Sequence, residues 1–192
     1  MRTDIEDYIQ KCHICQLCKK GKKYGHLSKQ VINQDPWNTI CVDTIGTYSV
    51  TTKHDKELSL LAITICNPVT GWFEVAKLKD KTALETSKVL DQVWFCCHPR
   101  PLRCITDNGC KSLGTEFQEL LRSYGIQHVP TTIKNPQANF VECVHQTLGN
   151  MIRTYELEKF EFDYNDPWSQ LLSNCAWVIR STVHSVLDAT LA

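Results

Sequence analysis

The stretch Trp37–Tyr48, WNTICVDTIGTY, is rich in β-branched and aromatic residues, which predicts a buried β-strand. Asp43 stands in its interior, where an aspartate is unusual. Side chains alternate along a strand, so Asp43 shares a face with Cys41 and Ile45. A carboxylate on such a face is costly to bury unless it is paired or holds a cation. The strand therefore predicts both a sheet and a site upon it.

Two further strand-like runs follow at Leu58–Cys66 and Trp72–Leu78. Asn67-Pro68 and Gly71 mark the turn between them, because these residue types favour turns. Three strands at this spacing predict an antiparallel meander.

Helices and strands alternate in the rest of the chain. This order predicts an α/β fold in which helices flank a five-stranded mixed sheet. The first helix begins at Thr82, which forms a capping-box pattern with Glu85. The expected elements are a helix from Thr82 to before Pro99, a strand Leu102–Thr106, a helix Thr115–Tyr124, a strand Ile126–Pro130, a helix from Asn135 to about Glu158 and a last helix from Asp166.

A change in composition at Asp35-Pro36 predicts a domain boundary, with a short segment over 1–34 and one main domain over 35–192. Lysine and arginine together balance the acids at 21 each, so net charge points to no partner. The first segment is nevertheless basic, with six lysines and no acid between Ile9 and Asn33. Phosphate contacts and a solvated surface tract explain it equally well. The lysines that we consider for DNA contact are Lys19, Lys20, Lys22 and Lys23.

The chain has 11 cysteines, its first residues do not resemble a signal peptide, and no stretch approaches the length of a membrane span. We therefore expect an intracellular, reducing environment and free thiols. Four of the cysteines fall in apolar runs and are expected in the core: Cys41, Cys66, Cys104 and Cys175.

Three acids occupy informative positions: Asp43 inside a strand, Asp107 just after one, and Glu142 early on a helix. Each alone has an ordinary explanation, as an edge residue, a turn former or a surface residue. Together they can hold two divalent cations, and their oxygen ligands suit Mg²⁺ or Mn²⁺. Two such ions promote attack on a phosphodiester by activating the nucleophile and stabilising the leaving oxygen.

At these positions the sequence resembles the integrases of long-terminal-repeat retrotransposons and retroviruses. The resemblance extends over roughly residues 5–190, and its motifs occur in the family's order. They are VDTIG at 42–46, ITDNG at 105–109, GTEFQELLRSYGI at 114–126, NPQAN at 135–139, the Glu142 segment ECVHQTL at 142–148, and the later DPW and STVH.

The resemblance implies an RNase H-like catalytic core, a polynucleotidyl transferase with Asp43, Asp107 and Glu142 as catalytic acids and ligands of two Mg²⁺ or Mn²⁺ ions. It also implies 3′-end processing and joining of element DNA to host DNA, a homo-multimer, no membrane association and action in the nucleus. Cys12 and Cys15 resemble half of the family's zinc site, so residues 1–34 are expected to be a truncated zinc-domain remnant with free thiols rather than bound zinc. A makeshift set that Cys18 and His26 complete is the alternative.

The chain departs from the family's pattern around the glutamate. One residue fewer than usual separates Asp107 from Glu142, and Phe140 and Cys143 replace the usual small residue and arginine. An inactive or domesticated copy that binds nucleic acid therefore stays as the alternative.

Polar residues near the three acids are candidates for DNA contact, because helix starts and amide side chains favour phosphate. The same residues are equally well explained as turn, cap or surface positions. The candidates are Asn108, Gln137, Asn139, His145 and Arg153. Trp94 and Trp177 lie in apolar stripes and are expected in the core.

Overall fold

The structure is a computed structural model that describes residues 35–51, 57–107, 114–130, 144–152 and 167–182. It also describes the single positions 3, 5, 8, 11, 12 and 190. No helix in these parts of the chain has the length and apolar character needed to cross a bilayer.

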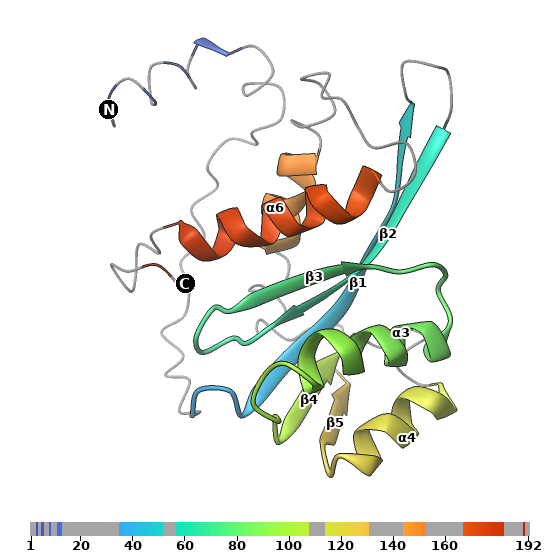
Figure 1. Ribbon diagram of the computed structural model, residues 1–192. Coiled ribbons are helices and arrows are strands. Elements are labelled where there is room, and N and C mark those ends of the chain that lie inside the picture. The colour runs from blue at the N-terminus through green and yellow to red at the C-terminus, as the bar shows by residue number, and fades with distance from the viewer. Residues whose placement is uncertain are drawn as a thin grey trace.

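Five strands form one mixed sheet in the order β3-β2-β1-β4-β5 (Figure 1). β1 pairs antiparallel with β2, and β2 pairs antiparallel with β3, which confirms the predicted meander. β4 and β5 add parallel strands on the other side of β1. The bounds are β1 Thr39–Thr51, β2 Glu57–Cys66, β3 Phe73–Lys77, β4 Arg103–Thr106 and β5 Gln127–Pro130.

The turn between β2 and β3 is built around Asn67, whose side chain is fully buried. Its Oδ1 accepts hydrogen bonds from the backbone N–H groups of Val69 and Thr70, at 3.0 and 2.7 Å. Its Nδ2 donates to the backbone oxygen of Thr39 at 2.9 Å. One amide therefore closes the predicted turn and joins it to the start of β1, which explains why a polar residue is buried here.

Alternation along β1 divides the core into two clusters, one on each face of the sheet. Cys41 and Ile45 belong to the cluster that also contains Leu148 and Ile152, and we call this side the first face. Ile40 and Val42 belong to the other cluster, with Trp94, Phe117 and Leu121, on the second face.

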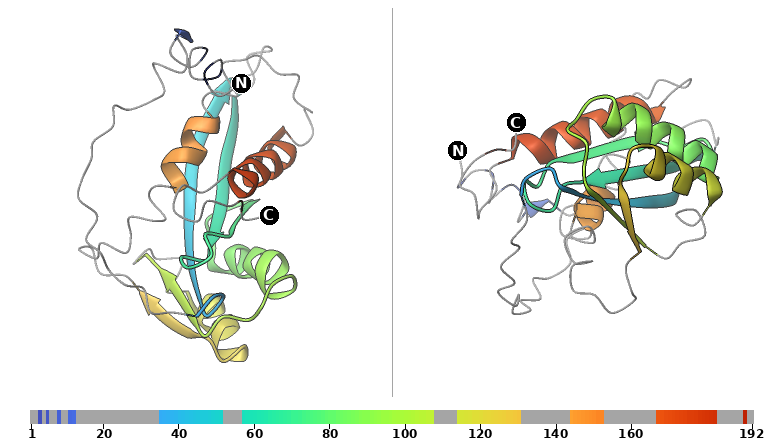
Figure 2. Two further views of the ribbon diagram at one scale, coloured as in Figure 1. Left: turned by 90° about the vertical axis from the view of Figure 1, so that its left-hand side faces the viewer. Right: turned by 90° about the horizontal axis from the view of Figure 1, so that it is seen from below.

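Helices cover both faces, as the alternating pattern predicted. The helix over residues 144–152 and α6 (Pro167–Ser181) pack on the first face. α3 (Ala83–Leu90), the π-helical turn η1 (Asp91–Phe95) and α4 (Thr115–Ser123) pack on the second face. In Figure 1, α6 and the helix over 144–152 lie above β3, whereas α3 and α4 lie below it, and the left view of Figure 2 shows the same upper and lower pairs.

The predicted cap of α3 is present, because Thr82 Oγ1 accepts a hydrogen bond from the backbone N–H of Glu85 at 3.2 Å. The helix expected to begin at Asn135 is helical over 144–152, and its earlier positions lie outside the described residues.

Gly46 allows an irregularity in β1, where the register with β2 shifts between Gly46 and Tyr48. Its φ is +107°, and a Cβ there would collide with the backbone oxygen of Leu60. Only glycine tolerates both conditions.

One core prediction is right and one is wrong. Trp94 is fully buried as expected, but Trp177 on α6 is 63% exposed. α6 buries the face that carries Leu171, Leu172 and Cys175, and Trp177 lies two positions after Cys175, on a different side of the helix.

Candidate metal and nucleic-acid site

Asp43 lies near the middle of β1, directly opposite Thr64 of β2. Its side chain is 29% exposed, although Cys41 and Ile45 on either side of it along the first face are buried. A partly buried carboxylate needs hydrogen-bond donors or cations around it. The neighbours of Asp43 include a backbone N–H donor and an imidazole ring.

Each carboxylate oxygen of Asp43 faces a different group. Oδ1 accepts a hydrogen bond from the backbone N–H of Thr44 at 2.7 Å. Oδ2 lies 3.5 Å from Nδ1 of His145, on the helix over 144–152. The imidazole is more buried than the carboxylate, with 18% of its side chain exposed. The contact joins the central strand to a helix about one hundred positions later in the chain.

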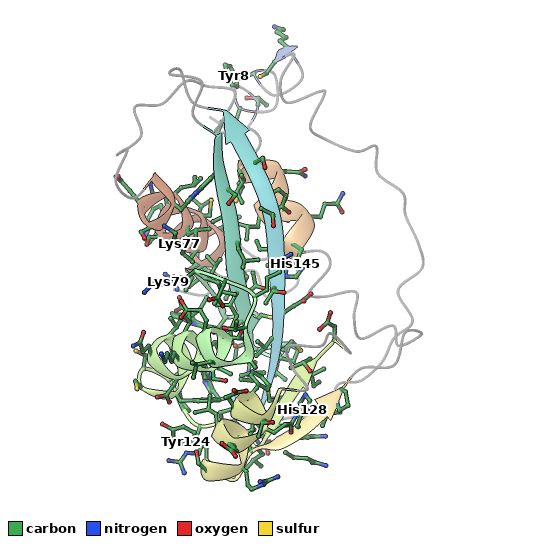
Figure 3. All side chains as sticks on the ribbon, turned by 90° about the vertical axis from the view of Figure 1, so that its right-hand side faces the viewer. Tyr8, Lys77, Lys79, Tyr124, His128 and His145 are labelled. Carbon is green, nitrogen blue, oxygen red and sulfur yellow. The ribbon has the colours of Figure 1, made fainter. Side chains whose placement is uncertain are left out.

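Thr64 holds the other side of the His145 ring. Its Oγ1 lies 2.6 Å from Nε2 of His145 and also donates a hydrogen bond to the backbone oxygen of Asp43 at 3.1 Å. Figure 3 shows His145 beside β1, within reach of both strands of the central pair. Asp43, Thr64 and His145 thus form a connected polar group within the apolar first face.

Asp107 follows the last residue of β4. The parallel register pairs Val42 with Thr106, so Asp43 and Asp107 are the next positions along two neighbouring strands. Neighbouring strands lie about 4.8 Å apart. Ile105 packs against the first-face cluster, and alternation places Asp107 on that same face. Asp107 is exposed, where β4 ends.

The donor set suits a hard divalent cation, because two carboxylates on adjacent strands bring like charges together at an exposed strand end. Within the described ranges, however, no three His, Cys, Asp or Glu side chains lie together in a way that would hold a metal ion. The group that the structure brings together is Asp43 with His145, and Asp107 directly follows the adjacent strand β4.

The second face carries a related but uncharged group. Thr106 Oγ1 lies 2.7 Å from Nε2 of His128 on β5, and His128 Nδ1 lies 2.8 Å from Nε2 of Gln118 on α4. Phe117 meets the imidazole edge-on. Burial lowers the pKa of His128 below its ordinary value of 6.5. The ring is therefore held neutral, with Gln118 donating to Nδ1 and Nε2–H donating to Thr106.

Four buried thiols lie in the core, three of them in the first-face cluster and Cys104 in the second-face cluster. Cys41 lies opposite Cys66 in the β1–β2 register. Their mutual hydrogen bond lowers the pKa of Cys41 and, together with burial, raises that of Cys66. Burial raises the pKa of Cys104, and it raises that of Cys175 to about 11. All four are buried free thiols, which confirms the prediction that they are core residues.

Most other predicted site residues lie outside the described residues. Cys12 is described and its backbone N–H donates to the oxygen of Tyr8 at 2.9 Å, but its predicted partner Cys15 is not described. Also outside are Glu142, Asn108, Gln137, Asn139, Arg153, Lys19, Lys20, Lys22 and Lys23.

His145 is described, and it makes contacts that sequence reasoning did not predict. Sequence reasoning placed it on a polar helix face as a possible DNA contact, whereas its ring contacts Asp43 and Thr64. The sequence did contain a sign of this contact with Asp43, because His145 shares a helix with apolar positions that must pack on the face where Asp43 lies. The sequence did not show which strand the helix would cover.

Comparisons with known proteins point to one group of enzymes. The human gypsy retrotransposon integrase-like protein 1 is 23% identical over 180 residues, which make up 94% of this chain and 33% of that protein. The chain spans about a third or less of the length of the curated relatives that it matches. No protein-family model matches the chain.

Solved structures agree in fold. The catalytic core domain of HTLV-2 integrase in complex with magnesium, in its trimeric form, has a TM-score of 0.61 and 23% identity, covering 81% of this chain and 94% of that one. A chain of the simian T-cell lymphotropic virus intasome in complex with PP2A regulatory subunit B56 gamma has a TM-score of 0.67 and 19% identity, covering 100% and 65%. The chain is thus similar in sequence to retrotransposon integrases and has the RNase H-like fold of integrase catalytic cores.

Proposed function

We propose that this chain is the catalytic core of a retrotransposon integrase, which binds DNA and carries out metal-dependent 3′-end processing and strand transfer. The contact between Asp43 and His145 supports this most directly. It fixes the helix that follows Glu142 in the sequence against the strand that carries the first acid. The function needs these two segments side by side, at the place where β4 ends.

The same contact bears on the shortened interval before Glu142. Positions three apart in a helix project from nearly the same side, and Glu142 precedes His145 by three. A helix extended by one turn toward its N-terminus would carry Glu142 on the side that faces Asp43. The missing residue would then be absorbed before the helix, leaving the acid correctly directed.

Asp43, Asp107 and Glu142 would hold two divalent cations, which when bound would activate the attacking oxygen and stabilise the leaving one. The protein's own part is to position the acids. β1 and β4 set the spacing of Asp43 and Asp107 through their parallel register, and Thr44 N–H fixes one oxygen of Asp43. The magnesium in the HTLV-2 core domain supports a divalent ion here.

The remaining assignments extend the same proposal. Residues 35–192 would form the catalytic core and residues 1–34 a remnant of a zinc domain. The partners would be the DNA ends of the element and host DNA, bound by a homo-multimer in the nucleus. The named intasome and the trimeric core domain support the multimer by similarity.

A strand-transfer assay tests the proposal. Purified protein is incubated with labelled double-stranded oligonucleotides and Mg²⁺ or Mn²⁺, and joined products are separated by length. We expect joining by the unaltered chain and none by Asp107→Asn. Glu119→Gln is the matched control, because it also neutralises one exposed acid but lies on α4, on the second face. DNA binding without any joined product would instead favour the inactive, domesticated copy.

A further inference from the structure

The His145 ring has the contacts of a metal-ligating histidine. Metal-bound histidines use one ring nitrogen for the ion, while a second group holds the other nitrogen and so fixes the ring. Here Nδ1 faces the carboxylate of Asp43 at 3.5 Å and Nε2 faces the hydroxyl of Thr64 at 2.6 Å. The contact of Nε2 with Thr64 therefore sets the direction in which Nδ1 points toward the carboxylate.

Counting hydrogens around Thr64 shows which ring nitrogen donates to it. A hydroxyl has one hydrogen, and that of Thr64 is donated to the backbone oxygen of Asp43. Both Thr64 contacts are hydrogen bonds at once only when Nε2 carries a hydrogen and donates it to Oγ1. Nδ1 is then the nitrogen that faces Oδ2 of Asp43, and a metal ion bound there would take the place of a proton between the two atoms.

Without that proton, Nδ1 and Oδ2 are two lone-pair donors placed close enough to bind one cation together. Neighbouring ligands of an octahedral ion with bonds of about 2.1 Å are about 3 Å apart. The 3.5 Å between Nδ1 and Oδ2 is close to that separation. The anchor is firm, because Thr64 and Asp43 are paired across β1 and β2.

We propose that His145 is a further ligand of the metal site, binding through Nδ1 one of the cations that Asp43 holds. The inference rests on the proposed function, since it concerns the same site. It adds a nitrogen donor to a set of carboxylates. Imidazole suits transition-metal ions, whereas Mg²⁺ prefers oxygen ligands. His145 therefore shifts the preference of the site from Mg²⁺ toward Mn²⁺.

Electron spin-echo spectroscopy of the full chain loaded with Mn²⁺ tests the ligand directly, because a nitrogen bound to Mn²⁺ modulates the echo. We expect ¹⁴N modulation in the unaltered protein and its loss in His145→Asn, where an amide replaces the imidazole. The matched control is His128→Asn, the same substitution at the histidine that contacts a threonine on the second face, and it retains the signal.

Affinities provide the second readout. Titration calorimetry should show that His145→Asn weakens Mn²⁺ binding by about 10-fold or more, with a much smaller change for Mg²⁺. Thr64→Val, which leaves the imidazole in place without its anchor, should weaken Mn²⁺ binding but keep the ¹⁴N modulation. Should His145→Asn fail to fold, unaltered protein grown with ¹⁵N-histidine replaces it, and the ¹⁴N signal should vanish there too.

The outcomes separate this inference from the proposed function. Strand transfer by a protein whose bound Mn²⁺ shows no nitrogen overturns the ligand assignment alone, and leaves His145 as an ion-pair partner of Asp43. A ¹⁴N signal that depends on His145 in a protein without strand transfer supports the ligand and overturns the proposed function. Absence of Mn²⁺ binding at millimolar concentration overturns both.

Discussion

Each face of the sheet carries a histidine whose Nε2 contacts a threonine hydroxyl, at 2.6 Å for His145 with Thr64 and 2.7 Å for His128 with Thr106. The other nitrogen distinguishes them. That of His145 faces the carboxylate of Asp43, whereas that of His128 faces the neutral amide of Gln118. Figure 3 labels both histidines, which come from different elements.

The two faces differ in the charge of the group that contacts the histidine. On the second face, the polar group around His128 is neutral and lies beside the aromatic ring of Phe117, so it can be buried at little electrostatic cost. On the first face, a carboxylate is only partly buried beside an exposed strand end. Under the proposed function, the charge there would hold a divalent cation.

The largest expected effect is on activity. Asp43→Asn should reduce strand transfer by about 10³-fold or more, since losing an anionic ligand removes several kcal/mol of transition-state stabilisation. Rates on labelled oligonucleotides measure it. An aspartate of the second face, Asp91→Asn, serves as the control and should keep most of the rate. If both variants retain activity, the first face is not the site.

Core substitutions should affect both faces alike. Leu90→Ala on the second face and Leu148→Ala on the first remove side chains with no exposed surface. Each should lower the free energy of unfolding by about 2–5 kcal/mol, as is usual when a core leucine is replaced. Urea denaturation gives both values. A loss below about 1 kcal/mol for Leu148→Ala would mean that its helix is not packed against the sheet.

The bulge in β1 should be specific to glycine. Gly46→Ala should cost about 1–3 kcal/mol, because φ is +107° and the added Cβ meets the Leu60 oxygen. Gly125→Ala is the control, since its φ is also positive, at +69°, but a Cβ there meets nothing within 4 Å. Thermal unfolding compares the two. Equal losses would mean that φ alone, and not contact with β2, governs Gly46.

The smallest expected effect is a pH dependence of the unfolding free energy that comes from His128 on the second face. Burial lowers the pKa of His128 in the folded protein below the ordinary 6.5, so the unfolded chain takes up the proton first as the pH falls. The stability from neutral His128 is complete above 6.5 and decreases as the pH falls through the folded pKa. Unfolding free energies between pH 7 and 5 should therefore fall less steeply in His128→Asn. An unchanged slope would contradict a buried neutral ring.

Much of the fold could be predicted because it depends on residues close together in the sequence. The alternation around Asp43, the Asn67 turn and the Thr82 cap each arise within a few positions. The exposure of Trp177 could not be predicted, because an apolar residue beside an apolar stripe looks the same whether or not another element covers it. That depends on where α6 lies on the sheet.

The site divides in the same way. The sequence by itself determined the strands, the placement of Asp43 inside one strand and Asp107 after another, and the family that their motifs resemble. Only the tertiary structure decided that the His145 ring lies between Asp43 and Thr64, although Thr64 precedes His145 by 81 positions in the sequence. The reason is that side-chain periodicity shows which face of an element is buried, whereas packing selects the partner that the face meets.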